Sequence, residues 1–145
     1  MTTYWAARFL VAAELERRRY SVSLPDEHAP GFDLAVTSAK GEQFLVDVKG
    51  LRTSKTPWLG AIKPPRESFF YILVFVGLDH NDDRFFILSQ SEWNALVEEY
   101  QRNHPNDPTS GFLWDAPLKY EGQWEKLTSS KPKKAKENQK GTLNA

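Results

Sequence analysis

Two runs of alternating apolar and polar residues, 32–37 and 43–49, are the feature that most constrains how this chain can fold. Alternation with a period of two is typical of β-strands that bury one face, and the short polar segment between the runs predicts a hairpin. A shift of one residue in the pairing would move every side chain to the opposite face. The length of the loop therefore decides which residues lie together.

A three-residue loop separates the apolar residues from the polar ones. With Ala39, Lys40 and Gly41 in the loop, and Gly41 in the left-handed conformation that such loops favour, Ser38 opposes Glu42. One face then carries Phe32, Leu34, Val36, Phe44, Val46 and Val48. The other face carries Asp33, Ala35, Thr37, Gln43, Leu45, Asp47 and Lys49. A two-residue Lys40-Gly41 turn would mix the two sets, so we reject it.

The polar face brings two carboxylates together. This register places Asp33 across from Asp47, with Cβ atoms roughly 4.5–5.5 Å apart, and opposed like charges are destabilising. A divalent cation compensates such a pair, because Mg²⁺ (or Mn²⁺) prefers oxygen ligands and is commonly held by one or two carboxylates. Lys49 projects from the same face, where its ammonium could orient an attacking water and stabilise charge on a phosphate. The sequence therefore predicts a metal site at Asp33 and Asp47, suited with Lys49 to phosphodiester hydrolysis.

The segments around the hairpin predict two helices and three further strands. Segment 4–20 lacks Gly and Pro and is rich in helix formers, which predicts a helix. A short strand is expected at 21–24, a strand buried on both faces at 69–76, and another at 84–88. Capping-box spacing predicts a second helix over about 90–102. The buried face of the first helix is expected to contain Ala6, Phe9, Leu10, Ala13 and Tyr20.

Composition indicates one domain over residues 1–127, because 145 residues with 40% hydrophobic content fit a single core. Aromatic and leucine residues after 105 are expected to fold back onto that core: Phe112, Leu113, Trp114, Leu118, Tyr120 and Trp124. The Lys-rich segment 128–145 predicts a disordered tail. No apolar run is long enough for a membrane span, no secretory signal is evident, and there are no cysteines, so we expect a cytoplasmic protein.

The formal charge of zero conceals an uneven distribution. Residues 131–145 hold five lysines and one glutamate, which leaves 14 basic and 18 acidic side chains in residues 1–130. Within this acidic body, residues 49–66 contain no Asp or Glu. We predict that Arg52, Lys55, Lys63 and Arg66 contact the phosphate backbone of a nucleic acid. Trp58 either stacks on a base or lies in the core.

The pattern Gly31-Phe32-Asp33 followed by Val46-Asp47-Val48-Lys49, after a helix and a strand, resembles the PD-(D/E)xK nuclease superfamily, which includes restriction enzymes and Holliday-junction resolvases. The resemblance covers about residues 4–90. It implies an α/β fold with a restriction-endonuclease-like core, in which helices flank a central mixed sheet in the order α-β-β-β-β-β-α. It also implies a metal-dependent deoxyribonuclease in which Asp33 and Asp47 bind the metal and Lys49 supports hydrolysis of DNA.

Resolvase-like members of the superfamily often carry a further catalytic glutamate in the first helix. Counting back from Tyr20 reaches Arg8 instead, and Glu14 is the nearest acidic substitute. Two other hypotheses therefore stay open beside the enzyme. The chain could be a catalytically inactive module that binds nucleic acid or a partner protein, or it could act as a homodimer or as a subunit of a larger restriction or repair complex.

Overall fold

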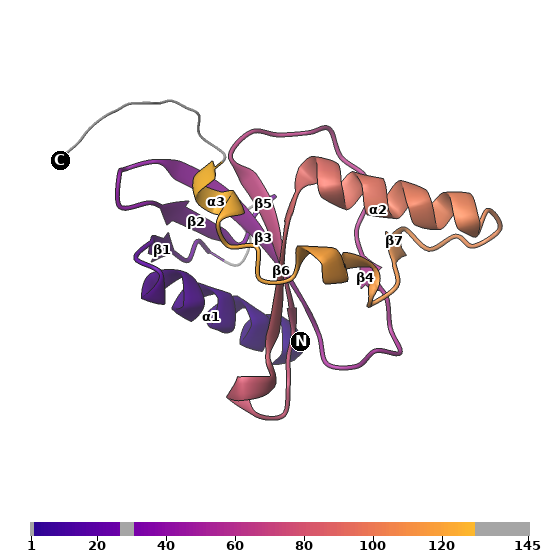
Figure 1. Cartoon of the computed structure of the whole chain (residues 1–145), viewed down its shortest axis with the longest axis horizontal. Coiled ribbons are helices and arrows are strands. Elements are labelled where there is room, and N and C mark those ends of the chain that lie inside the picture. The colour runs from indigo at the N-terminus through magenta and orange to yellow at the C-terminus, as the bar shows by residue number, and fades with distance from the viewer. Residues whose placement is uncertain (1, 27–30, 130–145) are drawn as a thin grey trace.

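A five-stranded mixed sheet forms the centre of the computed structural model, which describes residues 2–26 and 31–129 (Figure 1). In spatial order its strands are β1 (Ser21–Ser23), β2 (Leu34–Thr37), β3 (Gln43–Leu51), β5 (Phe69–Phe75) and β6 (Arg84–Ser89). Neighbouring strands are antiparallel except β3 and β5, which are parallel. The predicted α/β fold with a central mixed sheet is confirmed.

Helices cover both faces of this sheet. Helix α1 (Thr2–Arg17) packs on one face, and α2 (Gln90–Asn103) packs on the other (Figure 1). The crossover between the parallel strands β3 and β5 contains no helix but a short strand, β4 (Trp58–Leu59), which pairs with β7 (Gly111–Phe112). The remaining short elements are η1 (His80–Asp82), η2 (Ala116–Tyr120) and α3 (Lys126–Ser129). No helix in the described part of the chain is long and apolar enough to cross a membrane.

The hairpin register is confirmed. Thr37 pairs with Gln43 and Leu34 with Val46, and the Ser38 amide donates to the Glu42 carbonyl across the loop at 2.7 Å. Gly41 has φ +90°, the left-handed conformation that a three-residue loop requires. The polar and apolar faces therefore separate as the alternation predicts from Leu34 onward.

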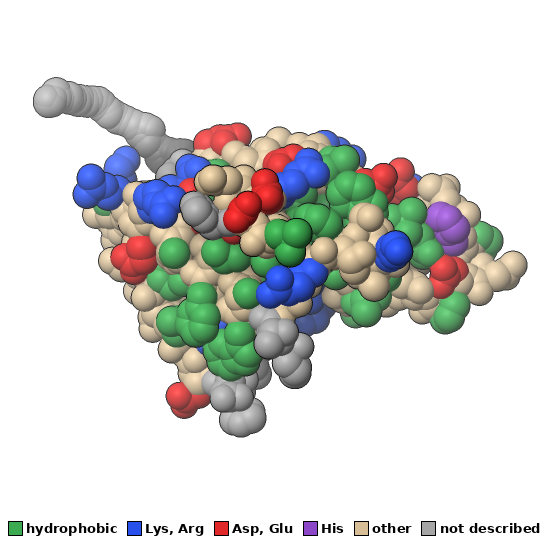
Figure 2. All heavy atoms as spheres, turned by 90° about the horizontal axis from the view of Figure 1, so that it is seen from below, with side chains coloured by type: hydrophobic (Ala, Val, Ile, Leu, Met, Phe, Trp, Pro, Cys, Tyr) green, Lys and Arg blue, Asp and Glu red, His purple; other side chains and the backbone are tan. Residues whose placement is uncertain are grey.

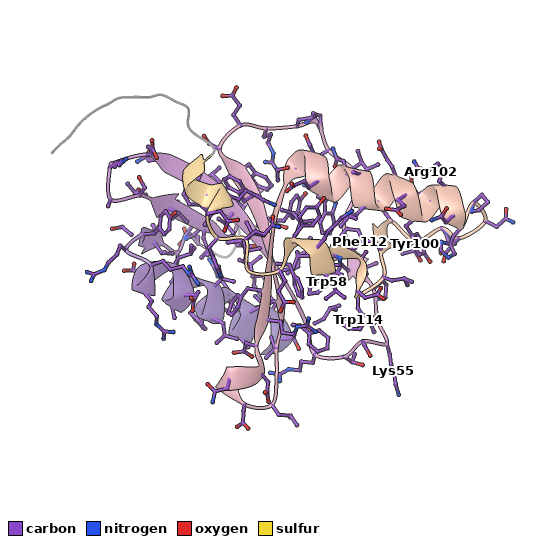
Figure 3. The ribbon with its side chains drawn as sticks, viewed as in Figure 1. Lys55, Trp58, Tyr100, Arg102, Phe112 and Trp114 are labelled. Atoms are coloured by element: carbon purple, nitrogen blue, oxygen red, sulfur yellow. The ribbon has the colours of Figure 1, made fainter. Side chains whose placement is uncertain are left out.

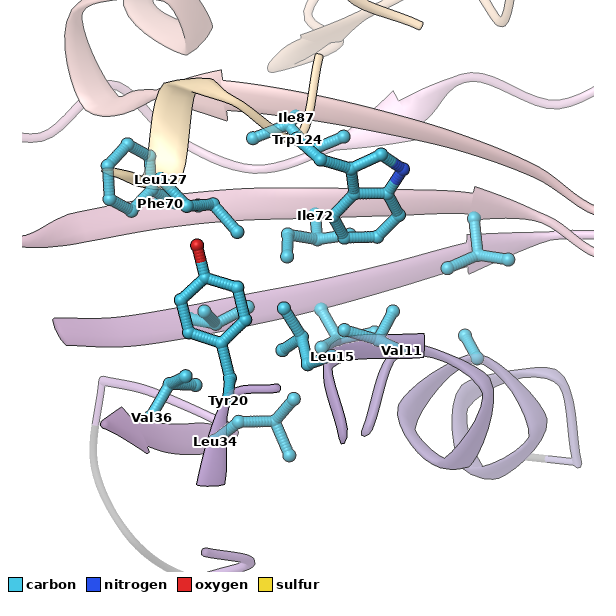
Figure 4. Packing of buried hydrophobic residues seen from close by; sticks show 14 of the residues in the cluster. Val11, Leu15, Tyr20, Leu34, Val36, Phe70, Ile72, Ile87, Trp124 and Leu127 are labelled. Carbon is cyan, nitrogen blue, oxygen red and sulfur yellow. The ribbon is translucent and has the colours of Figure 1, made fainter. Parts of the chain in front are cut away.

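Strand β5 is buried on both faces, as its continuous apolar sequence predicts. Phe70, Ile72 and Val74 point to the side of α1, while Tyr71 and Leu73 point to the side of α2. Figure 4 shows the first of these two clusters, in which Val11, Leu15, Tyr20, Leu34, Val36, Ile87, Trp124 and Leu127 surround Phe70 and Ile72. A hydrophobic core therefore lies on each face of the sheet.

The buried face of α1 differs from the predicted one. Ala7, Val11 and Leu15 are fully buried, whereas Phe9 is 54% exposed and Ala13 is also exposed. Apolar residues occur all around this helix, so their spacing alone does not identify the face that packs. The helix also ends at Arg17, and Tyr20 reaches the core after a turn in which Arg19 has φ +77°. The prediction of a helix continuing to residue 20 was therefore too long.

The C-terminal segment folds back onto the sheet only in part as expected. Phe112 and Trp124 are buried and the rings of Trp114 and Tyr120 are partly buried, but Leu113 and Leu118 are 50% and 39% exposed. The expectation for these two leucines was wrong: Leu113 follows β7, Leu118 lies in η2, and both side chains are exposed. Helix α3 continues to Ser129, and the predicted disordered tail otherwise lies outside the described residues.

Glycine at position 50 allows α1 to lie against β3. A Cβ atom there would stand 2.7 Å from the Ala7 Cβ and 3.1 Å from the Thr3 carbonyl oxygen. We expect Gly50→Ala to lower the free energy of unfolding by about 1–3 kcal/mol, because two backbones must separate to admit one methyl group. Urea denaturation measures the change, with Ser54→Ala in the exposed loop as the control. A stability equal to wild type would show that this close approach is not needed.

Candidate active site

A pocket of about 450 Å³ lies where the sheet opens between β2 and β3. Strand β2 pairs with β3 only up to Val46, whereas β3 continues to Leu51. The first turn of α1 and the segment around β4 close the remaining sides. The lining residues are Thr3, Tyr4, Asp33, Asp47, Val48, Lys49, Gly50, Leu51, Pro57, Trp58 and Leu59. The three residues predicted to form the site therefore line one cavity.

Asp33 lies just before β2, where the regular pairing of β2 with β3 is interrupted. Leu34 is the partner of Val46, yet the Asp33 amide also donates to the Val46 carbonyl at 2.8 Å, so that two residues face one as in a β-bulge. The extra residue reverses the direction of the next side chain. Phe32 consequently packs in the core on the side of α2, and its predicted place on the opposite face was wrong.

The Asp33 carboxylate is held by two hydrogen-bond donors. The Val48 amide donates to Oδ2 at 2.7 Å, which satisfies a β3 amide that β2 leaves without a ladder partner. The Tyr4 hydroxyl donates to Oδ1 at 2.6 Å. Burial, followed by the hydrogen bond to Asp33 and its charge, raises the pKa of the Tyr4 hydroxyl to about 12. Tyr4 therefore remains a donor throughout the physiological range.

Asp47 and Lys49 form an ion pair beside Asp33. The Lys49 ammonium is 3.3 Å from Oδ2 of Asp47, and both side chains are about a quarter exposed, at 27% and 25%. Burial raises the pKa of the Asp47 carboxyl, Lys49 opposes the shift, and the charge and hydrogen bonding of Asp33 add to it, giving a pKa of about 6. Two carboxylates thus share a space in which one of them holds a proton unusually tightly.

The donor chemistry of this pair fits a divalent cation. Each carboxylate oxygen has lone pairs beyond those its present donors use, and a cation would relieve the same repulsion that raises the pKa of Asp47. Mg²⁺ is commonly held by one or two carboxylates, with waters and substrate oxygens completing its shell. No cluster of three or more His, Cys, Asp or Glu suited to a metal occurs among the residues that the structure describes. Within this pocket, Asp33 and Asp47 are the two residues that would serve as acidic ligands of such a cation.

Lys49 is fixed by aromatic rings and by a close approach of the chain. Its ammonium lies 5.4 Å from the ring centre of Trp93 and 5.9 Å from that of Tyr71. A Cβ at Gly60 would stand 3.3 Å from the lysine Cε and 2.6 Å from the Trp93 ring. The lysine side chain therefore runs between the core of α2 and the segment that follows β4, which aims its charge at Asp47.

The four other basic residues of segment 49–66 do not converge on the pocket. Arg52 donates to the hydroxyl of Thr3 at the pocket wall, and Lys55 is exposed in the same loop. Lys63 and Arg66 lie nearer the start of α2; the Lys63 amide bonds to Asn94, and the Arg66 guanidinium stacks 3.5 Å from the Phe69 ring centre. Figure 2 shows acidic and basic side chains mixed over the lower face of the molecule.

Trp58 belongs to the core and not to a nucleic-acid surface. Its side chain is 1% exposed, and its indole N–H donates to the Trp114 carbonyl at 3.0 Å. Figure 3 shows Trp58 beside Phe112, while Lys55 extends away from the loop. The alternative in which Trp58 stacks on a base was therefore wrong, and the core alternative is confirmed.

The first helix supplies no acid to the pocket. Arg8 is 3% exposed and donates to the backbone carbonyls of Asp33 and Pro25, so it holds the chain that carries Asp33. Glu14 pairs with Arg17 and Arg18 and does not line the pocket. The helix instead contributes residues that the sequence did not single out, Thr3 and Tyr4, because neither belongs to a motif with recognisable spacing.

Comparison with known proteins supports the fold. No protein-family model matches the sequence, and no curated protein is significantly similar to it. Among solved structures, the bacterial homing endonuclease I-Ssp6803I is similar to this chain with a TM-score of 0.57 and 14% sequence identity. The similarity covers 88% of this chain and 93% of that one. The chain therefore shares its overall α/β fold with this endonuclease.

The raised pKa of Asp47 predicts how stability depends on pH. The folded state binds this proton more tightly than the unfolded state, so the free energy of unfolding should fall as pH rises from about 4 to about 6. In metal-free buffer at pH 7 we expect Asp47→Asn to be more stable than wild type by about 1–3 kcal/mol, with the difference vanishing below about pH 4. Urea titrations across this range measure it.

The same substitution at exposed Asp115 reports the effect of the amide itself. Parallel stability profiles for wild type and Asp47→Asn would contradict a tightly held proton at this carboxyl.

Proposed function

We propose that this protein is a metal-dependent endonuclease that hydrolyses phosphodiester bonds of DNA, built as a member of the PD-(D/E)xK superfamily. The observation that carries the proposal is the meeting of Asp33, Asp47 and Lys49 in one pocket at the open end of the hairpin. The nuclease-like fold is consistent with it. Mg²⁺ or Mn²⁺ is the cofactor that the donor set favours.

The residues of the pocket have different roles in the proposed hydrolysis. Asp33 and Asp47 would hold the cation, which supplies Lewis-acid polarisation of the scissile phosphate and neutralises part of its charge. Lys49 donates a hydrogen bond to the attacking water or to a phosphate oxygen and stabilises the negative charge that develops there. Its fixation by Trp93 and Gly60 lowers the cost of orienting that charge.

DNA contact is assigned to the loop beside the pocket. Arg52 and Lys55 lie in the segment that runs from β3 to β4, and Lys55 is free to extend toward a phosphate (Figure 3). Lys63 and Arg66 would meet the backbone farther along, near the start of α2. Such contacts position the duplex without reading its sequence.

The second candidate is a module of the same fold that binds nucleic acid or a partner protein without cutting. It is favoured by the burial of Arg8, which occupies the side of α1 where resolvase-like enzymes carry a glutamate. Calorimetry separates the two candidates: tight Mn²⁺ binding that Asp33→Asn abolishes would argue against a purely non-catalytic role. The proposed homodimer or larger complex, and the cytoplasmic location, remain predictions.

Cleavage assays test the enzyme directly. Wild-type protein should nick supercoiled plasmid with Mg²⁺ or Mn²⁺ and not with EDTA. Asp47→Asn and Lys49→Ala should each reduce the cleavage rate roughly 100-fold or more, because the first removes the charge of a proposed metal ligand and the second removes a positive charge at the reacting phosphate. Asp115→Asn, an exposed residue outside the pocket, should cut like wild type. Equal cleavage by wild type and Asp47→Asn, or no cleavage of linear, supercoiled, flapped or four-way DNA, would rule out the proposal.

The role of the loop can be tested by the salt dependence of DNA binding in EDTA. Each phosphate contact contributes about 0.9 to the slope of log affinity against log salt concentration. Lys55→Ala should reduce that slope by about 1 and weaken binding equally for unrelated sequences. Arg102→Ala removes an exposed charge at the far end of α2 and serves as the control (Figure 3). An unchanged slope for Lys55→Ala would place DNA elsewhere.

A further inference from the structure

We infer that Tyr4 is a positioning residue of the site, which fixes the Asp33 carboxylate in the orientation that binds the cation. The inference rests on the proposed function for the identity of the ligand. It assigns to α1 a role in the site through a hydroxyl group, since Thr3 and Tyr4, and not Glu14, are the residues of this helix that line the pocket. The carrying observation is the 2.6 Å hydrogen bond from Tyr4 to Oδ1 of Asp33 inside the pocket.

Asp33 needs support from outside its own strand. It lies one residue before β2, and its amide shares the Val46 carbonyl with the end of the ladder. A side chain at such a position can turn about its first two torsions, and each turn points its oxygens elsewhere. The backbone is held by Arg8, which donates to the Asp33 carbonyl, but that contact leaves the carboxylate itself free to rotate.

Two donors from different elements fix the rotation. The Val48 amide holds Oδ2, and the Tyr4 hydroxyl holds Oδ1. Both oxygens are then defined, inside the pocket that Asp47 also lines. Tyr4 is itself held, since its ring packs edge-on against Trp5 at 5.5 Å between ring centres. Removing the hydroxyl alone would leave this ring contact and the helix unchanged.

The test is Tyr4→Phe, compared with wild type for Mn²⁺ affinity by calorimetry and for DNA cleavage. Loss of a group that orients a metal ligand costs about 10–100-fold in affinity or activity, so we expect a Kd for Mn²⁺ raised by that factor. At saturating metal the cleavage kcat should remain below wild type while KM for DNA stays the same. A residue with a merely structural role would lower stability without raising the Kd for Mn²⁺ and without lowering kcat at an unchanged KM.

Tyr100→Phe is the matched control, because the Tyr100 hydroxyl also donates to a carboxylate, that of Asp107, at a place outside the pocket. It should leave metal affinity and cleavage at the wild-type values. Equal values for Tyr4→Phe and wild type would overturn the inference.

A metal-free measurement keeps the inference separate from the proposed function. Thermal unfolding of Tyr4→Phe, Asp33→Ala and the double variant should be non-additive, with Tyr4→Phe lowering Tm by a few degrees only while the Asp33 acceptor is present. Additive shifts would overturn the inference whatever the protein catalyses. Wild-type protein that binds no Mn²⁺ and cuts no DNA would overturn the proposed function, and the thermal cycle would then decide alone whether Tyr4 positions Asp33.

Discussion

The hydrogen bond from the Val48 amide to Asp33 is the interaction on which the site depends. Where β2 ends, β3 continues and exposes an amide that would otherwise lack a partner, and an unpaired amide away from water is costly. The carboxylate of Asp33 satisfies this amide and is thereby drawn to the centre of β3. The same bond that completes the sheet therefore brings the first acidic residue to Asp47 and Lys49, which lie on either side of Val48 in the strand.

The two neighbouring carboxylates at the pocket lower the electrostatic stability of the folded protein. Asp47 lies beside Lys49 and a second carboxylate, and its pKa, raised mainly by burial, shows that the environment disfavours its charge. A single lysine compensates only one of the two acids. Sites that bind a cation or a phosphate commonly accept such a cost, because the ligand later neutralises it. Under the proposed function, the stability that this repulsion costs would be recovered when a cation binds.

The fold was largely predictable from the sequence because its strongest signals are local. Alternation and loop length set the hairpin register, and the continuous apolar run defined β5 as a strand between two cores. The packed face of α1 was not predictable in the same way, since its apolar residues surround the helix. That face is chosen by the close approach at Gly50 and by the carbonyls that Arg8 must reach, and both depend on segments distant in sequence.

Asp33, Asp47 and Lys49 line one pocket, but not through the regular strand pairing that the alternation implies. A regular ladder would oppose the two acids directly, but the chain steps out of register at Asp33 and sends Phe32 to the other core. The acids still meet because the Asp33 side chain accepts the hydrogen bond of the Val48 amide, which the backbone of a regular strand would otherwise accept. The strand pattern could not predict Tyr4, since a residue of the first helix becomes part of the site only through tertiary packing. Helix α1 contributes no acidic residue to the described lining of the pocket and instead holds the backbone of Asp33 with Arg8 and its carboxylate with Tyr4.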